Sequence, residues 1–204
     1  MITIVDYGLG NIRAFINTYK QLGLPITVAR NAQELKQASK IILPGVGAFD
    51  LAMTLFQQSG MREVADELVQ EKDVPVLGIC VGMQIMASSS DEGQLPGLNW
   101  IPGRVRKFNR AVLGASLPLP HMGWNNVSAL DQHGLFNGLS HAASFYFLHS
   151  FYYECEDGAH VLAQSQYGQE FSCAVRRGSV HGVQFHPEKS HSAGTRLLKN
   201  FAEL

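Results

Sequence analysis

The chain has 204 residues, of which 46% are hydrophobic and 16% charged, a balance that excludes intrinsic disorder and suits one large domain. Its formal net charge of −1 argues against a broad basic face for nucleic acid, although the basic stretch GRVRKFNR at 103–110 could still serve a partner. No apolar run reaches the roughly 18 residues of a membrane helix, and the start MITIVDYGLGN lacks the features of a signal peptide, so we expect a soluble cytoplasmic protein.

The first ninety residues alternate between apolar strands and helical patterns. Strands are predicted at 2–5, 26–29, 40–45 and 74–80. Helices are predicted at 12–22, 31–38 and 49–71, the last interrupted near residues 59–60, and again from residue 83 onward. Asn31 and Glu34 have the spacing of a helix cap with its reciprocal partner. Because the strands are apolar on both faces, they indicate a parallel sheet covered by helices on both sides.

The region from about residue 95 to 185 has a different pattern. Its segments are short, β-prone and separated by glycines, which predicts an antiparallel extension of the sheet. A final helix is predicted from about residue 193, with Leu197, Leu198 and Phe201 on its apolar side. No linker is evident, so we expect residues 1–204 to form a single α/β domain with an open, mostly parallel mixed sheet flanked by helices.

The segment VPVLGICVGMQ at 74–84 places Cys80 between Gly78 and Gly82, where a strand gives way to a helix. Small flanking residues permit a tight turn that presents the thiol at the carboxyl edge of the sheet. The partial positive charge of the helix N-terminus favours a thiolate there. The N–H of Val81 would then help to hold an oxyanion. The same motif alone is equally compatible with a small cysteine buried in the core.

The segment QFHPEKS at 184–190 supplies a candidate base for this thiol. His186 and Glu188 are two residues apart on an extended segment, so their side chains point the same way. Glu188 could therefore orient His186 and stabilise its imidazolium form. A lone histidine at a strand end is more often a satisfied surface or core residue, and only the pairing with the cysteine motif favours catalysis.

Other candidate sites are weaker. Cys155 and Cys173 lie in β-prone stretches without a comparable turn and are predicted to be structural. No CxxC or HxxxH pattern is present, so no metal site is predicted. The LPGVGAF segment at 43–49 is either an ordinary turn or, through the N–H near Gly47, the other half of an oxyanion hole. The stretch DYGLGN lacks the third glycine of a dinucleotide-binding loop.

Three segments together, PGVGAF, GICVGMQ and FHPEKS, resemble class I (triad-type) glutamine amidotransferases in order and spacing. Four more are similar to the glutaminase subunits of imidazole glycerol phosphate synthase, namely VDYGLGNIRA, PHMGWNNV, YFLHSFYY and EKSHSAGTRLLKNF. The resemblance covers essentially the whole chain. It implies a flavodoxin-like fold, no cofactor, and a heterodimer with a separate (β/α)8 cyclase subunit.

The resemblance also implies roles for individual residues. Catalytic roles are implied for Cys80 as nucleophile, His186 as base and Glu188 as the third member of the triad. Oxyanion roles are implied for Gly47 and Val81, glutamine-binding roles for Gln84, His149, Ser150 and Phe151, and interface positions for Trp124 and Lys189. The family usually has tyrosine where this chain has Phe151, so a side-chain hydrogen bond is lost there while backbone contacts remain possible.

The implied reaction is hydrolysis of glutamine through a thioester on Cys80. The ammonia would pass to the cyclase subunit, which forms imidazole glycerol phosphate and AICAR, an aminoimidazole ribonucleotide, in histidine biosynthesis. The resemblance further implies low glutaminase activity until the partner is loaded. Glycines in PGVG would permit the backbone rotation that such control requires.

Three competing interpretations remain open. Another thiol hydrolase, of peptidase or glyoxalase-like type, could use the same turn but often takes its triad from other positions. The glutaminase of pyridoxal phosphate synthesis is a closer rival, against which VDYGLGN and PHMGWN argue. A scaffold or regulatory subunit with an inactive site is disfavoured because Cys80, His186 and Glu188 are all present.

Overall fold

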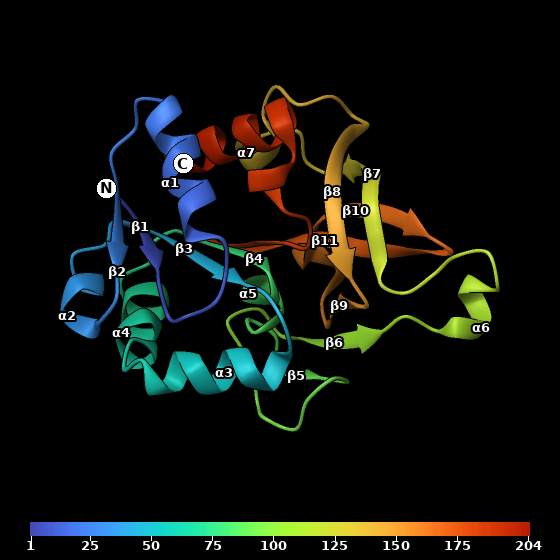
Figure 1. The fold of residues 1–204 in the computed structure, drawn as a ribbon, viewed down its shortest axis with the longest axis horizontal. Coiled ribbons are helices and arrows are strands. Elements are labelled where there is room, and N and C mark those ends of the chain that lie inside the picture. The colour runs from blue at the N-terminus through green and yellow to red at the C-terminus, as the bar shows by residue number, and fades with distance from the viewer.

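A twelve-stranded sheet forms the centre of the computed structural model, which describes residues 1–204 (Figure 1). The strands are β1 (Ile2–Val5), β2 (Ile26–Ala29), β3 (Lys40–Gly45), β4 (Val76–Cys80), β5 (Ser89–Ser90), β6 (Gly103–Lys107), β7 (His121–Ala129), β8 (Ala143–His149), β9 (Phe151–Cys155), β10 (Val161–Tyr167), β11 (Gln169–Arg177) and β12 (Val180–Val183). Their order along the main path is β2-β1-β3-β4-β12-β11-β10-β7-β8, and β9 joins β6 and β5 to β11.

Most of the helices cover the parallel half of this sheet. The α-helices are α1 (Ile12–Gln21), α2 (Ala32–Leu35), α3 (Phe49–Gln58), α4 (Arg62–Asp66), α5 (Val81–Gln84), α6 (Arg110–Leu113) and α7 (His191–Glu203). A π-helical turn η1 (Glu67–Glu71) continues α4, and short 3₁₀ turns are η2 (Gly134–Phe136), η3 (Gly158–His160) and η4 (Pro187–Lys189). In Figure 1, α1 and α7 lie on one side of the parallel strands, and α3 and α4 lie on the other, whereas α6 lies at the far end of the sheet.

The parallel half has the order expected of a flavodoxin-like sheet. Strands β2, β1, β3, β4 and β12 pair in parallel, and β12 takes the fifth place in the order 2-1-3-4-5. Every residue of β1, β4 and β12 is buried, which agrees with the apolar runs in the sequence. Beyond β12 the pairings along the main path are antiparallel, as the change in sequence pattern predicts. The short pair β5–β6, off this path, is parallel.

Two helix predictions are wrong in their lengths. The helix expected at 31–38 is the single turn α2, although Asn31 does cap it by accepting the N–H of Glu34 at 3.0 Å. The Glu34 carboxylate accepts the backbone N–H of Arg30 and the side-chain amide of Asn31, and not the backbone N–H of Asn31 that the reciprocal cap requires. The helix expected from residue 83 onward is α5, which ends at Gln84. It stops there because the carbonyls of the next three residues accept N–H groups from the loop at 98–101.

The remaining helix boundaries agree more closely with the sequence. The helical region at 49–71 is broken at Ser59 and Gly60, as predicted, and continues as α4 and η1. The final helix begins at His191, two residues before its predicted start. No helix of the structure has the length and apolar character required to cross a membrane.

Strand register brings distant segments together at the carboxyl edge of the sheet. On one side of β4, Gly45 of β3 is paired with Cys80. On the other side, Val183 of β12 is paired with Ile79. The residues that directly follow β3 and β12 therefore flank Cys80, at the edge where open α/β sheets bind their ligands.

We expect Gly82→Ala to destabilise the protein severely. A Cβ at Gly82 would lie 1.9 Å from the carbonyl oxygen of Leu43, so α5 and β3 would have to separate. The expected loss in the free energy of unfolding is about 3 kcal/mol or more, measured by urea denaturation.

Gly158→Ala is the matched control, because a Cβ there has no neighbour within 4 Å. We expect this control to stay within about 0.5 kcal/mol of the wild type. Equal stability of the two variants would contradict the proposed contact between α5 and β3.

Candidate functional site

The thiol of Cys80 stands on a tight turn between β4 and α5. Its backbone has φ +55° and ψ −113°, an unusual conformation for a residue with a side chain. Both flanking glycines are required by close packing: a Cβ at Gly78 would lie 2.7 Å from the carbonyl oxygen of Gly82. The strand-to-helix turn predicted from the sequence is therefore confirmed. Close packing of the surrounding backbone keeps Cys80 in its strained conformation.

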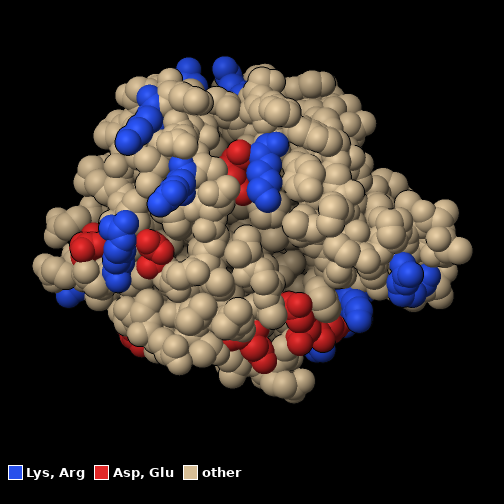
Figure 2. Space-filling view, in the orientation of Figure 1, with Lys and Arg blue, Asp and Glu red and all other residues tan.

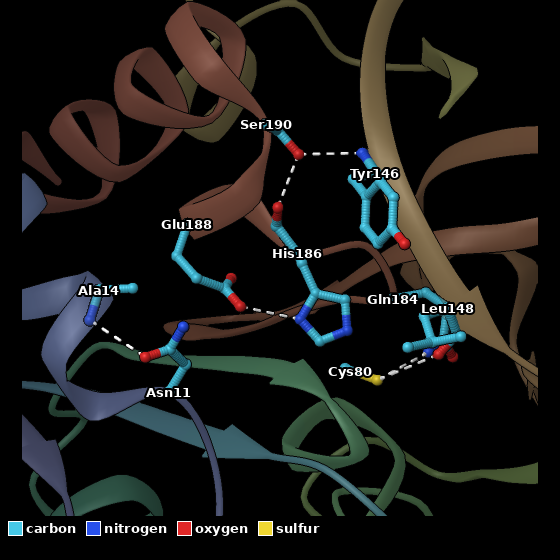
Figure 3. A network of polar contacts seen from close by, with 9 residues as sticks. All are labelled: Asn11, Ala14, Cys80, Tyr146, Leu148, Gln184, His186, Glu188 and Ser190. Atoms are coloured by element: carbon cyan, nitrogen blue, oxygen red, sulfur yellow. Dashed lines mark hydrogen bonds and ion pairs between the residues drawn. The ribbon is translucent and has the colours of Figure 1, made fainter. Parts of the chain in front are cut away.

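The imidazole of His186 lies between Cys80 and Glu188 (Figure 3). His186 follows β12 at a spacing of three residues from Val183, and Glu188 lies in the 3₁₀ turn η4. The distance from His186 Nδ1 to Glu188 Oε1 is 2.9 Å, and both side chains are almost completely buried. The carboxylate accepts the Nδ1 proton, which leaves the other ring nitrogen on the side of Cys80.

The surroundings of His186 favour its protonated form. Burial lowers the pKa of His186, but hydrogen bonds to Cys80 and Glu188, together with the charges of these groups, outweigh burial and raise that pKa from 6.5 to about 9. A histidine in this state pairs with a thiolate and holds a proton that a leaving group can take.

A serine attaches the backbone of His186 to strand β8. The hydroxyl of Ser190 donates to the carbonyl of His186 at 2.6 Å and accepts the N–H of Tyr146 at 3.0 Å (Figure 3). The N–H of His186 in turn donates to the carbonyl of Tyr146 at 2.8 Å. These three hydrogen bonds fix the position of the imidazole relative to β8.

A pocket of about 260 Å³ opens in front of Cys80. The residues predicted for the site that line it are Gly47, Cys80, Val81, Gln84, His149, Ser150, Phe151, His186 and Lys189. Glu188 does not line the pocket, because it lies behind His186. Trp124 also lies outside it, on β7, where its ring stacks on that of His191 with 5.1 Å between ring centres.

The structure adds Glu92 to the pocket wall, a residue that the sequence did not single out. Its carboxylate accepts the N–H of Phe49, the first residue of α3, at 2.9 Å. Glu92 follows the two-residue strand β5 in a loop without a recognisable motif, so only the folded chain reveals its place. It brings a carboxylate to a pocket that Lys189 also lines, while the ammonium group of Lys189 lies 5.7 Å from the centre of the Tyr146 ring.

At Phe151 the backbone, rather than the side chain, contributes to the site. The Phe151 carbonyl accepts a hydrogen bond from His149 Nδ1 at 2.7 Å and another from Gln84 Nε2 at 3.3 Å. Both contacts use only the backbone carbonyl of Phe151, so they do not depend on the tyrosine hydroxyl that this chain lacks. The Phe151 ring lies 5.9 Å from the ammonium of Lys107.

Two hydrogen-bonded histidines adjoin the pocket: His149 lines it, and His121 lies behind His149. His121 Nδ1 is 2.9 Å from His149 Nε2, and both rings are buried among aromatic side chains, including Phe147 and Phe171. Burial lowers the pKa of His121 from 6.5 to about 4. Burial, together with the charges of His121 and His186, also lowers the pKa of His149 to about 3, against a raising contribution from its hydrogen bond to Phe151. Both histidines are therefore neutral at physiological pH.

The surface around the site has mixed charge. Figure 2 shows basic and acidic side chains scattered among uncharged ones on this face, with acidic groups along the lower border of a central hollow. Strand β7 exposes two large apolar side chains, Met122 and Trp124, which are 61% and 49% accessible. Exposed apolar side chains beside a pocket are typical of an interaction surface.

The sequence of the whole chain is similar to known glutamine amidotransferases. The family model for "Glutamine amidotransferase class-I" matches residues 3–204. The "Imidazole glycerol phosphate synthase subunit HisH" of Bdellovibrio bacteriovorus is 61% identical over 204 residues and covers all of both chains. The protein of the same name from Leptospira borgpetersenii is 50% identical, again over the full length of both.

Solved structures share the fold at much lower identity. A glutamine amidotransferase crystal structure superposes with a TM-score of 0.76 at 20% identity, covering 99% of this chain and 97% of the other. The structure of PurLQS from Thermotoga maritima gives a TM-score of 0.71 at 17% identity, covering 99% of this chain and 97% of the other. These similarities establish the fold expected from the sequence.

We expect the stability of the protein to fall as the pH drops from 6.5 to about 4. The pKa of His121 is about 4 when folded and 6.5 ordinarily, so in this window the unfolded chain binds more protons than the folded chain. The stabilisation is complete above pH 6.5 and is lost by roughly 1.4 kcal/mol per pH unit below it. His186 acts in the opposite sense: its pKa of about 9 gives stability that is lost as the pH rises toward 9.

Urea denaturation at several pH values measures this effect. His121→Gln should show a shallower loss between pH 6.5 and 4 than the wild type. His141→Gln, at an exposed histidine, should keep the wild-type slope. The same slope in all three proteins would show that the buried histidine pair is not responsible.

Proposed function

This chain belongs to the class-I glutamine amidotransferase family, and on that premise we propose that it is the glutaminase subunit of an imidazole glycerol phosphate synthase. One observation carries the chemistry: Cys80, on a strained turn, faces a histidine whose Nδ1 lies 2.9 Å from the buried carboxylate of Glu188. The full-length similarity to proteins named HisH supports the assignment to this synthase. Residues 1–204 would form a single glutaminase domain.

In the first half of the reaction, His186 accepts the Cys80 proton and the sulfur attacks the carboxamide carbon of glutamine. The C–N bond of the tetrahedral intermediate then breaks, and the imidazolium of His186 gives its proton to the departing ammonia. The raised pKa of His186 suits this acid role, and Glu188 stabilises the imidazolium throughout. A glutamyl thioester on Cys80 remains.

In the second half, water replaces ammonia. His186, now neutral, takes a proton from a water molecule that attacks the thioester carbonyl. When this intermediate collapses, its C–S bond breaks and glutamate is released. The sulfur leaves as a thiolate beside the imidazolium of His186, which holds the proton taken from water and can return it to the sulfur. Backbone N–H groups of Val81 and of the Gly47 region would stabilise both oxyanions, because both residues line the pocket.

The pocket provides groups for the two charged ends of glutamine. The Glu92 carboxylate would attract the α-ammonium group, while Lys189 on the pocket wall would favour the α-carboxylate. Gln84, Ser150 and the backbone of the segment from His149 to Phe151 would bind the remaining polar groups of the substrate, because both ring nitrogens of His149 already have partners. The side chain of Phe151 offers no hydrogen bond, but its backbone carbonyl holds the side chains of Gln84 and His149 in place.

The relatives are named as subunits, which implies a partner. We propose that the partner is a HisF-like (β/α)8 cyclase, in a heterodimer, and that it receives the ammonia. Trp124 and Met122 on β7 would form part of the interface, with Lys189 at its edge. Both apolar side chains are exposed, and Met122 is paired with Leu148, which lines the pocket. A positive φ of 91° at Gly47 would allow the oxyanion strand to rotate when the partner is loaded.

We expect Cys80→Ala to abolish glutamine-dependent synthesis while leaving ammonium-dependent synthesis intact. The variant lacks the nucleophile, but the cyclase chemistry takes place in the other chain. The experiment mixes the chain with the cyclase subunit and its nucleotide substrate, then measures glutamate release and imidazole glycerol phosphate formation with glutamine or ammonium.

The ammonium arm serves as the internal control for assembly of the complex. Undiminished glutamate release by Cys80→Ala would contradict the mechanism. Absence of release from the wild-type complex would contradict the proposed function itself.

A further inference from the structure

The side chain of Gln184 reaches the sulfur of Cys80 from a position without solvent access. Gln184 directly follows β12, and its side chain is fully buried. Its amide nitrogen, Nε2, is 3.7 Å from Cys80 Sγ, within the range of a hydrogen bond to sulfur. The pairing of β12 with β4 places the two residues side by side, because Val183 is paired with Ile79.

The orientation of the Gln184 amide follows from a neighbouring backbone carbonyl. The carbonyl of Phe151 can only accept, so the end of Gln84 that meets it at 3.3 Å must be the amide nitrogen. That nitrogen also lies 3.0 Å from the other polar end of Gln184, which must then be the acceptor Oε1. The NH₂ group of Gln184 is consequently the end that faces Cys80 Sγ.

The buried histidine pair holds the same carbonyl from its other side. His149 Nδ1 lies 2.7 Å from the Phe151 carbonyl and must donate to it, so Nε2 accepts from His121 Nδ1 at 2.9 Å. His121 Nε2 in turn accepts from the Asn125 amide at 3.3 Å. That amide nitrogen also donates to the carbonyl of Gln166 at 2.8 Å, which fixes its orientation. The three hydrogen bonds that link Asn125, His121, His149 and the Phe151 carbonyl therefore all run in the direction of that carbonyl.

We propose that Gln184 is a further catalytic residue, whose side-chain N–H donates a hydrogen bond to the Cys80 sulfur and stabilises its thiolate form. This role rests on the proposed glutaminase function and extends it. A hydrogen bond to a charged acceptor is stronger than one to a neutral acceptor, and no water competes for the sulfur from this buried side. Gln84 and the histidine pair act as positioning residues, because they hold the donor in place without touching the sulfur.

No proton of Gln184 is transferred in this role. The thiol proton goes to His186, and the Gln184 N–H remains bonded to nitrogen while its hydrogen bond to sulfur strengthens. When the thioester forms, the sulfur loses its charge and this hydrogen bond weakens. When the thioester is hydrolysed, sulfur is the leaving group, and the same donor stabilises the charge that returns to it.

A Gln184 variant retains the other titratable groups around Cys80. His186 follows β12, His149 ends β8, and Tyr7 follows β1, with its hydroxyl donating to the carbonyl of Pro44 at 2.7 Å. Glu92 and Lys189 line the pocket in front of the thiol. A change in the acid–base behaviour of Cys80 on substitution of Gln184 would therefore report on the amide donor.

The test is the rate of Cys80 alkylation by iodoacetamide as a function of pH, followed by peptide mass spectrometry on the full-length chain. In Gln184→Met, which keeps the length but removes the donor, the midpoint of the profile should move to higher pH. At pH 7 the alkylation rate constant should fall about tenfold or more. In the synthase complex, kcat for glutamate release should fall by a similar factor with little change in KM.

The matched control is Gln164→Met on β10, where the side-chain amide donates to Glu170 at 2.7 Å, away from Cys80. Its alkylation profile should coincide with that of the wild type. Gln184→Glu provides a second, isosteric variant that retains the acceptor for Gln84, and its profile should shift at least as far. Thermal denaturation verifies that each variant is folded.

A wild-type alkylation profile in either folded Gln184 variant would overturn the proposal. A shift confined to KM, with unchanged kcat and alkylation, would show that Gln184 only shapes the pocket. The alkylation assay uses no glutamine, so failure of the wild-type complex to release glutamate would reject the proposed function separately. A shifted profile in that case would still support the amide donor.

Discussion

The position of the Cys80 thiol depends on direct contact between the backbones of α5 and β3. Gly45 and Gly82 approach so closely that a Cβ on Gly45 would lie 2.4 Å from the N–H nitrogen of Gly82. This contact holds α5 against the sheet and keeps Cys80 in its strained conformation at the end of β4. The parallel neighbour β12 then delivers the base on the other side, so the site is assembled from three adjacent strand ends.

The buried histidines of the site illustrate how partner chemistry decides protonation. His186 meets a carboxylate and a sulfur, and its pKa rises to about 9 despite burial. His121 and His149 meet each other, an amide and a carbonyl, and burial keeps both neutral. A single site thus contains one histidine suited to carry a proton and a neutral pair whose hydrogen-bond direction is fixed. The first would serve the reaction, and the second would hold the groups that surround it.

Much of this arrangement could be predicted from the sequence because local patterns encode it. The strands at 2–5 and 40–45 have the predicted bounds, since buried parallel strands are continuous apolar runs between turns. The turn at Cys80 could be inferred from its flanking glycines. The contact between His186 and Glu188 is also expected from their spacing, but on an extended segment, whereas the structure forms it through the 3₁₀ turn η4.

Other parts depend on tertiary structure that no local pattern contains. The early end of α5 results from hydrogen bonds to a loop more than ten residues away. Gln184 reaches the thiol only because β12 pairs with β4 in one particular register, and Glu92 joins the pocket from a loop without a motif. The partner of His121 is likewise on another strand, 28 residues further along the chain. Such contacts follow from the fold and could be recognised only after it was known.

The glutaminase role is tested most directly by trapping the covalent intermediate. The chain is mixed with the cyclase subunit and its nucleotide substrate, supplied with glutamine, quenched in acid during turnover and digested for peptide mass spectrometry. A glutamyl group bound to Cys80, and absent when glutamine is omitted, is the predicted result. Steady glutamate release without any adduct on Cys80, or with an adduct on another residue, would contradict the mechanism.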